Sequence, residues 1–369
     1  MRILIITTHN ANNYGAILQA YALQSFMEQY GAVNILNYEN RHLAKSFDLI
    51  RRPSNLRGVL GMGKDIARIF PRYRVINKFK SFIDRYIYLT ESVSESDLRD
   101  GKFNTYDVYI SGSDQIWNPV CINKDRCLDE NYFLNFAPNG ASKFSYASSI
   151  GGYKFSSNEE NLLSKLLCDF NQISVREKDT SDYLSKIIDR RVEYVLDPTL
   201  LLSKSDWYNR LNIADKSINN EKYILLYTVP KNQLIKSIVS FYAKKLGLKV
   251  VAIDQGLNAG VKVDSHLRDV SPSEFIELFY YAEFIVTDSF HGVCFSVNFQ
   301  KQFVVVSEGV HANRIVSLLE LTGLKDRLIQ SERDIGLVKS RIDFKSALLK
   351  LEKARLQSRK YIENGLVGL

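Results

Sequence analysis

The chain has 369 residues, 45% of them hydrophobic and 24% charged, which is an ordinary composition for a globular protein long enough to form two domains. The net charge of +8 arises in one segment, because the 12 Lys and Arg residues between Arg41 and Arg85 face only three Asp and Glu residues, an excess of nine. The remainder is nearly neutral, which excludes the distributed basic surface of a nucleic-acid-binding protein.

The four cysteines have neither CxxC nor zinc-site spacing, and the residue pattern favours reduced thiols. No apolar run approaches the roughly 20 residues that a membrane helix requires, and the N-terminus lacks the apolar core of a signal peptide. We therefore expect a soluble, cytoplasmic protein. The basic segment 41–86 is either a solvated face or a peripheral contact with the inner face of the membrane or with a diphosphate-linked substrate.

The first elements in the chain predict a Rossmann-like start. Residues 2–7 form a continuous apolar strand, residues 16–30 have helical spacing, and residues 33–38 form a second strand. The polar turn between the first strand and the helix contains no GxGxxG, so no dinucleotide site is predicted. Within this turn lie Asn13, Tyr14 and Gly15, which are either substrate contacts or only the opening of the helix.

The predicted N-terminal domain covers residues 1–200 and includes the basic insertion 41–86. Four further short strands are expected, at 106–110, 144–147, 172–175 and 192–196. Ser113 and Asp114 follow the first of these strands, where Asp114 either orients a sugar hydroxyl or caps a helix. Asp197-Pro198 is interpreted as a structural entrance to a hinge.

The predicted C-terminal domain covers residues 201–345, and helix 346–369 is expected to pack back on the first domain. Strands are predicted at 223–229, 249–253, 284–286 and 303–306, and helices at 233–246, 271–281, 292–298, 313–321 and 344–363. The fold class is therefore α/β, with two Rossmann-like domains that face a cleft.

The stretch 282–306 carries the strongest site prediction. Asp288 and Ser289 follow a strand and precede a helix, where backbone N–H groups and the helix dipole favour an anion. His291 lies in the first turn of this helix. In open α/β sheets, ligands bind at such carboxyl edges.

Six segments occur in an order that resembles the polysaccharide pyruvyl transferase family: NYGAILQAYAL, YDVYISGSDQIWNP, SYASSIG, ISVREKD, VLDPTLLL and IVTDSFHG. The resemblance implies a fold similar to B-type glycosyltransferases. It also implies transfer of pyruvate from phosphoenolpyruvate to two hydroxyls of a sugar as a ketal, in exopolysaccharide, capsule or another cell-surface glycan or its lipid-linked precursor. Phosphoenolpyruvate would be the donor substrate, with no cofactor.

The same resemblance suggests roles for single residues. His291 is the catalytic acid/base candidate and Arg176 the donor clamp, since Arg binds carboxylate and phosphate in a bidentate manner. Phe290 occupies the place of a family arginine, and Arg314 is a candidate to supply that charge.

Other interpretations remain open. Arg176 could serve only a salt bridge to Glu177 or Asp179, and His291 only a cap or packing contact. The other histidines have no metal-ligand spacing, so no metal site is predicted. The alternative functions are a nucleotide-sugar-dependent glycosyltransferase of the same fold and a non-catalytic glycan-binding relative.

Overall fold

The computed structural model describes residues 1–50, 63, 68–213, 221–228, 232–306, 312–338 and 341–367. The chain forms two compact units. Unit 1 comprises Met1–Ser46, Ile83–Leu202 and Glu352–Leu369, and unit 2 comprises Phe47–Phe82 and Ser203–Leu351. The sequence-based division placed the basic insertion in the first domain, whereas most of it groups with unit 2. Residues 51–62 and 64–67 of the insertion lie outside the described residues.

Unit 1 is built on a five-stranded parallel sheet with the order β3-β2-β1-β4-β5. Its strands are β1 (Arg2–Ile6), β2 (Ala32–Tyr38), β3 (Leu89–Val93), β4 (Val108–Ser111) and β5 (Ser142–Ser145). A parallel pair, β6 (Ser174–Val175) and β7 (Glu193–Tyr194), continues beside β5 through isolated bridges such as Ser148 with Val175. This arrangement confirms a Rossmann-like unit.

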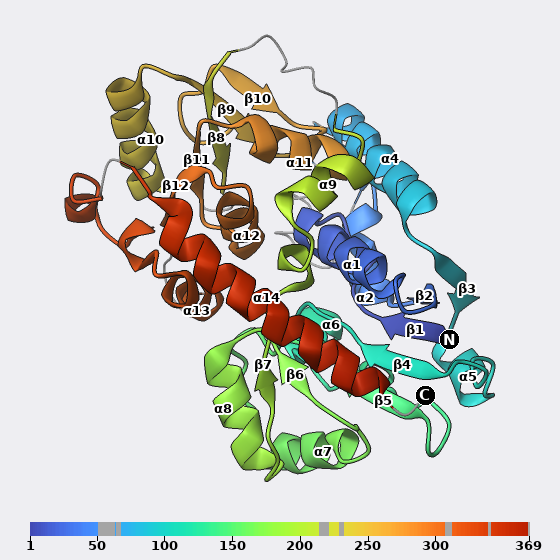
Figure 1. The fold of residues 1–369 in the computed structure, drawn as a ribbon. Helices are drawn as coiled ribbons and strands as arrows, with labels where there is room; N and C mark the ends of the chain where they lie inside the picture. The colour runs from blue at the N-terminus through green and yellow to red at the C-terminus, as the bar shows by residue number, and fades with distance from the viewer. Residues whose placement is uncertain are drawn as a thin grey trace. The chain divides into compact units, whose positions relative to one another are not determined.

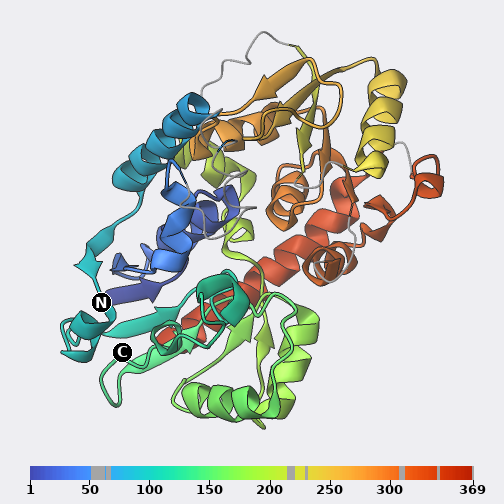
Figure 2. The same ribbon diagram turned by 180° about the vertical axis from the view of Figure 1, so that it is seen from behind.

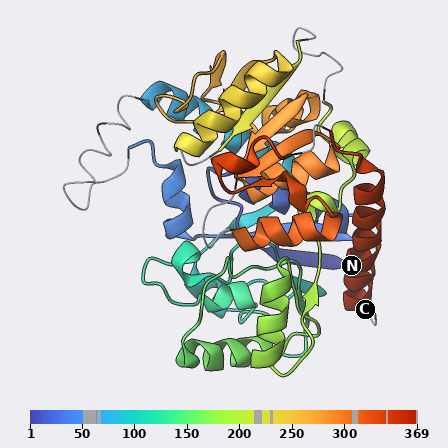
Figure 3. The ribbon, with the colours of Figure 1, turned by 90° about the vertical axis from the view of Figure 1, so that its left-hand side faces the viewer.

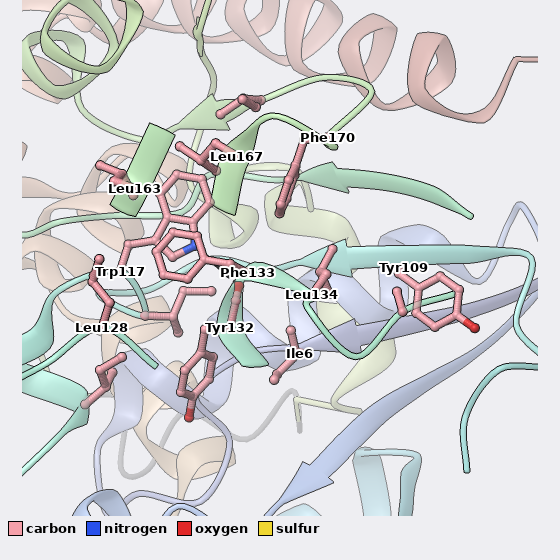
Figure 4. Packing of buried hydrophobic residues seen from close by; sticks show 14 of the residues in the cluster. Ile6, Tyr109, Trp117, Leu128, Tyr132, Phe133, Leu134, Leu163, Leu167 and Phe170 are labelled. Carbon is pink, nitrogen blue, oxygen red and sulfur yellow. Dashed lines mark hydrogen bonds between the residues drawn. The ribbon is translucent and has the colours of Figure 1, made fainter. Parts of the chain in front are cut away.

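The core of unit 1 forms because alternate residues of the strands point to the same face. Leu4 and Ile6 of β1 share one buried cluster with Trp117 and Phe133, whose rings stack at 5.3 Å between centroids (Figure 4). The helices of the unit are α1 (Tyr14–Met27), α2 (Arg41–Ala44), α5 (Glu95–Arg99), α6 (Pro119–Ile122), α7 (Ser157–Leu167) and α8 (Lys178–Ile187). Every residue of α1 is buried. Short 3-10 helices lie at Lys45–Phe47, Glu130–Phe133 and Pro198–Leu200.

Unit 2 has a six-stranded parallel sheet with the order β10-β9-β8-β11-β12-β13. Its strands are β8 (Tyr223–Tyr227), β9 (Lys249–Ile253), β10 (Ser265–Leu267), β11 (Phe284–Thr287), β12 (Gln302–Val306) and β13 (Leu328–Ile329). Helix α10 (Gln233–Leu246) covers one face of the sheet (Figure 3). There Tyr242 stacks on Phe284 at 4.4 Å between ring centroids. The other face lies against α11 (Pro272–Tyr281) and α12 (Phe290–Asn298), through contacts such as Phe275 with Tyr227. Helices α9 (Lys204–Arg210) and α13 (Ala312–Thr322) and the 3-10 turns Lys325–Arg327 and Glu332–Asp334 are the other described elements that lie wholly within unit 2.

Two long helices contain residues of both units, namely α4 (Ile69–Tyr86) and α14 (Phe344–Leu366). The C-terminal part of α14 lies beside β5 (Figures 1 and 2). There the hydroxyl of Tyr361 donates to the carbonyl of Ser145 at 2.7 Å. Gln172 Nε2 donates to the carbonyl of Tyr361 at 2.7 Å. These bonds join the last turns of the chain to the sheet of unit 1.

The basic segment makes structural contacts in its described part. Arg72 donates two hydrogen bonds to the carbonyl of Asp48, and Arg74 and Lys78 of α4 form ion pairs with Asp269 and Glu274. Several of its cations are therefore already engaged within unit 2. No described helix is long and apolar enough to cross a membrane.

Candidate functional site

The strand order of unit 1 reverses between β1 and β4, since the chain proceeds from β1 outward to β3 and then returns to β4 on the other side. Open α/β sheets bind ligands at this topological switch point, outside the carboxyl ends of the strands. The segment after β1 leads to Asn13, Tyr14 and Gly15, and the segment after β4 contains Ser113 and Asp114. The strand order therefore brings two predicted groups of site residues to one edge.

Hydroxyl groups join the strand ends at this edge. Thr7 Oγ1 donates to the carbonyl of Ser113 at 2.7 Å, and Ser113 Oγ donates to the carbonyl of Ala147 at 2.8 Å. Ser148 Oγ donates to the carbonyl of Gly112 at 2.8 Å. Because these side chains satisfy buried carbonyl groups, they rigidify the edge rather than offer themselves to a ligand.

The residues of the first turn differ in exposure. Asn13 is exposed and caps α1, its Oδ1 accepting from the backbone N–H of Ala16 at 3.3 Å, whereas Tyr14 and Gly15 are buried. His9, in the same segment, is buried, and its Nε2 lies 3.1 Å from Asn37 Oδ1. Burial lowers the pKa of His9 and outweighs its hydrogen bonds, which favours the neutral form of the imidazole.

Arg176 lies at the centre of a buried ion-pair cluster. Its Nη1 is 2.8 Å from Asp197 Oδ2, its Nη2 is 3.1 Å from Asp114 Oδ1, and its Nε is 3.7 Å from Glu177 Oε1. The side chains of Arg176 and Asp197 are fully buried. Burial acts to lower the pKa of the guanidinium, but the neighbouring carboxylates outweigh it and raise this pKa above its ordinary value.

This geometry argues against direct contact between Arg176 and the phosphoenolpyruvate expected as donor substrate. The N–H groups of its guanidinium already face the carboxylates of Asp114, Glu177 and Asp197. Asp114, which is 17% exposed, is the member of the cluster nearest to solvent, and it adopts a left-handed φ of 76°. A non-glycine residue in this region is strained, and such strain is concentrated at functional sites. The carboxylate of Asp114 is therefore the part of the cluster that solvent can reach, and Arg176 holds it in place.

Unit 2 has its own switch point, between β8 and β11. Thr287 ends β11, and its Oγ1 donates to the carbonyl of Tyr227, the last residue of β8, at 2.7 Å. The same oxygen accepts from the backbone N–H of Ser289 at 3.1 Å. Ser289 in turn caps α12, its Oγ accepting from the N–H of Gly292 at 3.3 Å. The predicted turn thus lies at the switch point, with α12 starting from it.

Gly292 permits the tight approach of α12 to β11. A Cβ atom at this position would lie 2.3 Å from Thr287 Oγ1, which is far inside contact distance. We expect Gly292→Ala to lower the free energy of unfolding by about 1–3 kcal/mol, the usual cost of overpacking. Urea denaturation would measure this, with Gly336→Ala as the matched control, because nothing lies within 4 Å of a Cβ atom there. Equal stability of the two variants would refute the close packing.

The side chains around the first turn of α12 include the predicted cation. The guanidinium carbon of Arg314, on α13, lies 5.7 Å from the centroid of the Phe290 ring, and the His291 ring packs edge-on against Phe290 at 5.3 Å. His291 is 9% exposed. Asp288 lies near Tyr227, whose pKa is raised by burial first and then by the charge of Asp288. The structure therefore places the guanidinium of Arg314 over the ring of Phe290, beside the first turn of α12.

Sequence reasoning missed Asp197 as the main partner of Arg176, although VLDPTLLL contains it, because the Asp-Pro dipeptide suggested a hinge. It also missed Thr287, which connects β8 to the turn of unit 2. Among the described residues, no group of three or more His, Cys, Asp or Glu side chains is arranged to hold a metal ion.

Solved structures share this fold. Anabaena HepE in complex with UDP and glucose superposes with a TM-score of 0.52 and 10% identity over 100% of both chains. A UDP co-structure of MnaA from S. aureus superposes with a TM-score of 0.51 and 12% identity, over 99% of this chain and 96% of that one. At this identity the likeness establishes the fold alone, that of B-type glycosyltransferases and epimerases.

No curated protein sequence matches the chain significantly. The family model described as polysaccharide pyruvyl transferase matches residues 13–309, which include Asn13, Asp114, Ser289 and His291. The chain therefore belongs to the polysaccharide pyruvyl transferase family.

Proposed function

We propose that this protein transfers pyruvate from phosphoenolpyruvate to two hydroxyls of a sugar in a cell-surface glycan or its lipid-linked precursor, forming a ketal. Family membership supports a transferase. The donor is assigned to the edge of unit 2 that contains Ser289, His291 and Arg314, and the acceptor to the edge of unit 1 that contains Asn13 and Asp114.

The observation that carries the donor assignment is the guanidinium of Arg314 above the ring of Phe290, at the N-terminus of α12. A cation and a helix N-terminus at one turn favour an anion, and phosphoenolpyruvate carries both a phosphate and a carboxylate. The imidazole of His291 belongs to the same turn.

The chemistry needs proton transfers that suit these groups. The oxygen of the first sugar hydroxyl bonds to C2 of phosphoenolpyruvate and loses its proton, while C3 takes a proton and becomes a methyl group. The bond between C2 and the bridging oxygen then breaks, phosphate leaves with that oxygen, and the oxygen of the second hydroxyl bonds to C2 while its proton passes to the released phosphate. We assign the proton transfer at C3 or at a hydroxyl to His291, whose side-chain type exchanges protons near neutral pH. No cofactor takes part in this scheme.

A thermal-shift experiment tests the donor assignment. Phosphoenolpyruvate at 100 times its Kd should stabilise the protein by about 2.7 kcal/mol through mass action. Arg314→Gln should lose most of this stabilisation, whereas Arg333→Gln, at the surface of unit 2, should keep it. Equal stabilisation of the wild type and Arg314→Gln would reject the role of Arg314.

The second candidate is a nucleotide-sugar-dependent glycosyltransferase, since the HepE and MnaA structures of the same fold contain UDP. Stabilisation by UDP-sugars and not by phosphoenolpyruvate would favour it.

The non-catalytic alternative would be rejected by phosphate release from phosphoenolpyruvate that depends on an added acceptor. Contact of segment 41–86 with an anionic membrane remains a secondary proposal, and binding to anionic vesicles would test it.

A further inference from the structure

Unit 1 contains a cavity of about 640 Å³ that none of the six sequence motifs lines. This volume is within the range of small-molecule sites. Its lining combines carboxylates, amides and aromatic rings, including Tyr38, Glu95, Asp129, Asn131, Asn135 and Phe136. Such a mixture of hydrogen-bonding groups and ring faces is suited to a polyhydroxylated ligand.

The cavity lies at the carboxyl edge of the sheet of unit 1. Tyr38 is the last residue of β2, and Glu95 is the first residue of α5, which begins directly after β3. The switch point between β1 and β4 lies on the same edge, because all these strands are parallel. The cavity is therefore on the edge to which the acceptor is assigned.

The polar groups in the lining are held in place before any ligand binds. The hydroxyl of Tyr38 donates to Asp129 Oδ2 at 3.1 Å, and the backbone N–H and Nδ2 of Asn131 both lie 3.1 Å from Asp129 Oδ1. Asn131 Nδ2 also donates to the hydroxyl of Tyr38 at 3.1 Å. Burial raises the pKa of Asp129, and this effect is larger than the lowering by these hydrogen bonds. Further hydrogen bonds donated by the hydroxyls of a ligand would favour the ionised form of its carboxyl group. Preorganisation reduces the entropy lost on binding.

The charge of the lining selects among the components of the reaction. Glu95, Asp129 and Glu130 contribute carboxylates against the single guanidinium of Arg99, which is itself paired with Glu95. Like charges repel a phosphate or a carboxylate, so neither phosphoenolpyruvate nor a lipid diphosphate fits here. Sugar hydroxyls, by contrast, donate to carboxylate oxygens, and their C–H faces pack on aromatic rings.

We propose that this cavity binds a neutral glycosyl unit of the acceptor, through Asp129 and Asn131. The proposal rests on the proposed function for the nature of the acceptor. It assigns a specificity-determining role to residues outside the family motifs.

Cys127 provides a direct probe of occupancy. It is an exposed free thiol in the lining, whereas Cys168 is an exposed thiol outside it. The wild-type protein would be treated with iodoacetamide in the presence of methyl glycosides of glucose, galactose, mannose and N-acetylglucosamine. Peptide mass spectrometry would follow the two thiols separately. We expect at least one glycoside to slow alkylation of Cys127 and to leave Cys168 unaffected.

Two variants connect this protection to the lining. Asp129→Asn should weaken glycoside binding at least about tenfold, since it removes a charged acceptor. Asn135→Trp should block the cavity sterically from an exposed position, so it keeps the test valid if Asp129→Asn impairs folding. Asp125→Asn is the matched control, an exposed carboxylate on the same loop outside the lining.

The outcomes separate this proposal from the proposed function, because the alkylation assay contains no phosphoenolpyruvate. Protection of Cys127 that both lining variants abolish, with unchanged stabilisation by phosphoenolpyruvate, supports the cavity as an acceptor site. Absence of protection by every glycoside, or protection that survives in both variants, overturns it. Protection without any stabilisation of the wild type by phosphoenolpyruvate refutes the donor assignment and leaves the cavity as a carbohydrate site.

Discussion

Replacement of His291 by alanine should lower turnover by about 10²–10⁴-fold, the range typical of a general acid or base. The reason is the requirement for a proton at C3 of the donor and the removal of a hydroxyl proton, which an alanine side chain cannot meet. His291 lies in the first turn of α12 against the ring of Phe290, so the substitution leaves the capping bonds of Ser289 in place. Phosphate release from phosphoenolpyruvate in the presence of an acceptor glycan measures the effect.

His291→Gln separates proton transfer from packing, because glutamine retains a polar side chain that cannot titrate. We expect it to be as slow as the alanine variant while thermal stabilisation by phosphoenolpyruvate is retained. His266→Gln is the matched control in unit 2, since His266 contacts the backbone carbonyl of Asp254 in a structural position. Wild-type turnover in either His291 variant would remove this residue from the mechanism.

Replacement of Arg176 by methionine should destabilise the protein by about 3–5 kcal/mol, the cost of leaving buried charge uncompensated. The side chain of Arg176 is fully buried, and its removal leaves the carboxylates of Asp197 and Asp114 without the cation that both contact. Urea denaturation followed by circular dichroism would measure the loss. If Arg176 is instead an open donor clamp, stability should change little and only phosphoenolpyruvate binding should fall.

The matched control is Arg191→Met, because Arg191 forms an ion pair with Glu193 at the surface with its own side chain 83% exposed. Exposed pairs contribute about 0–1 kcal/mol, so this variant should remain close to the wild type. A loss in Arg176→Met no larger than that of the control would contradict the buried cluster.

The regular elements were largely predictable from local patterns. The helices at 233–246 and 271–281 and the strand at 249–253 occur where apolar spacing and capping residues indicated them. The strands Leu89–Val93, Ser265–Leu267 and Leu328–Ile329 were missed, because they are short or lack a continuous apolar run. Such edge strands depend on pairing with a neighbour rather than on their own composition.

The candidate site also divides into residues that local patterns could predict and contacts that depend on distant segments. The turn residues Ser289 and His291 could be recognised because capping and strand signals are contiguous in the chain, and the family motif contains them. Arg176 could be recognised as a candidate, but its partner Asp114 lies 62 residues away, so its burial among carboxylates was not readable.

The sequence by itself determined the α/β class, the order of most elements and the chemistry available at two turns, because periodicity, capping and turn residues act over a few neighbouring positions. Only the tertiary structure decided which strand ends meet and which charges share a buried cluster. It also decided that β2, α5 and the segment 123–136 line one cavity. These properties follow from strand order, which brings distant segments together through nonlocal pairing and burial.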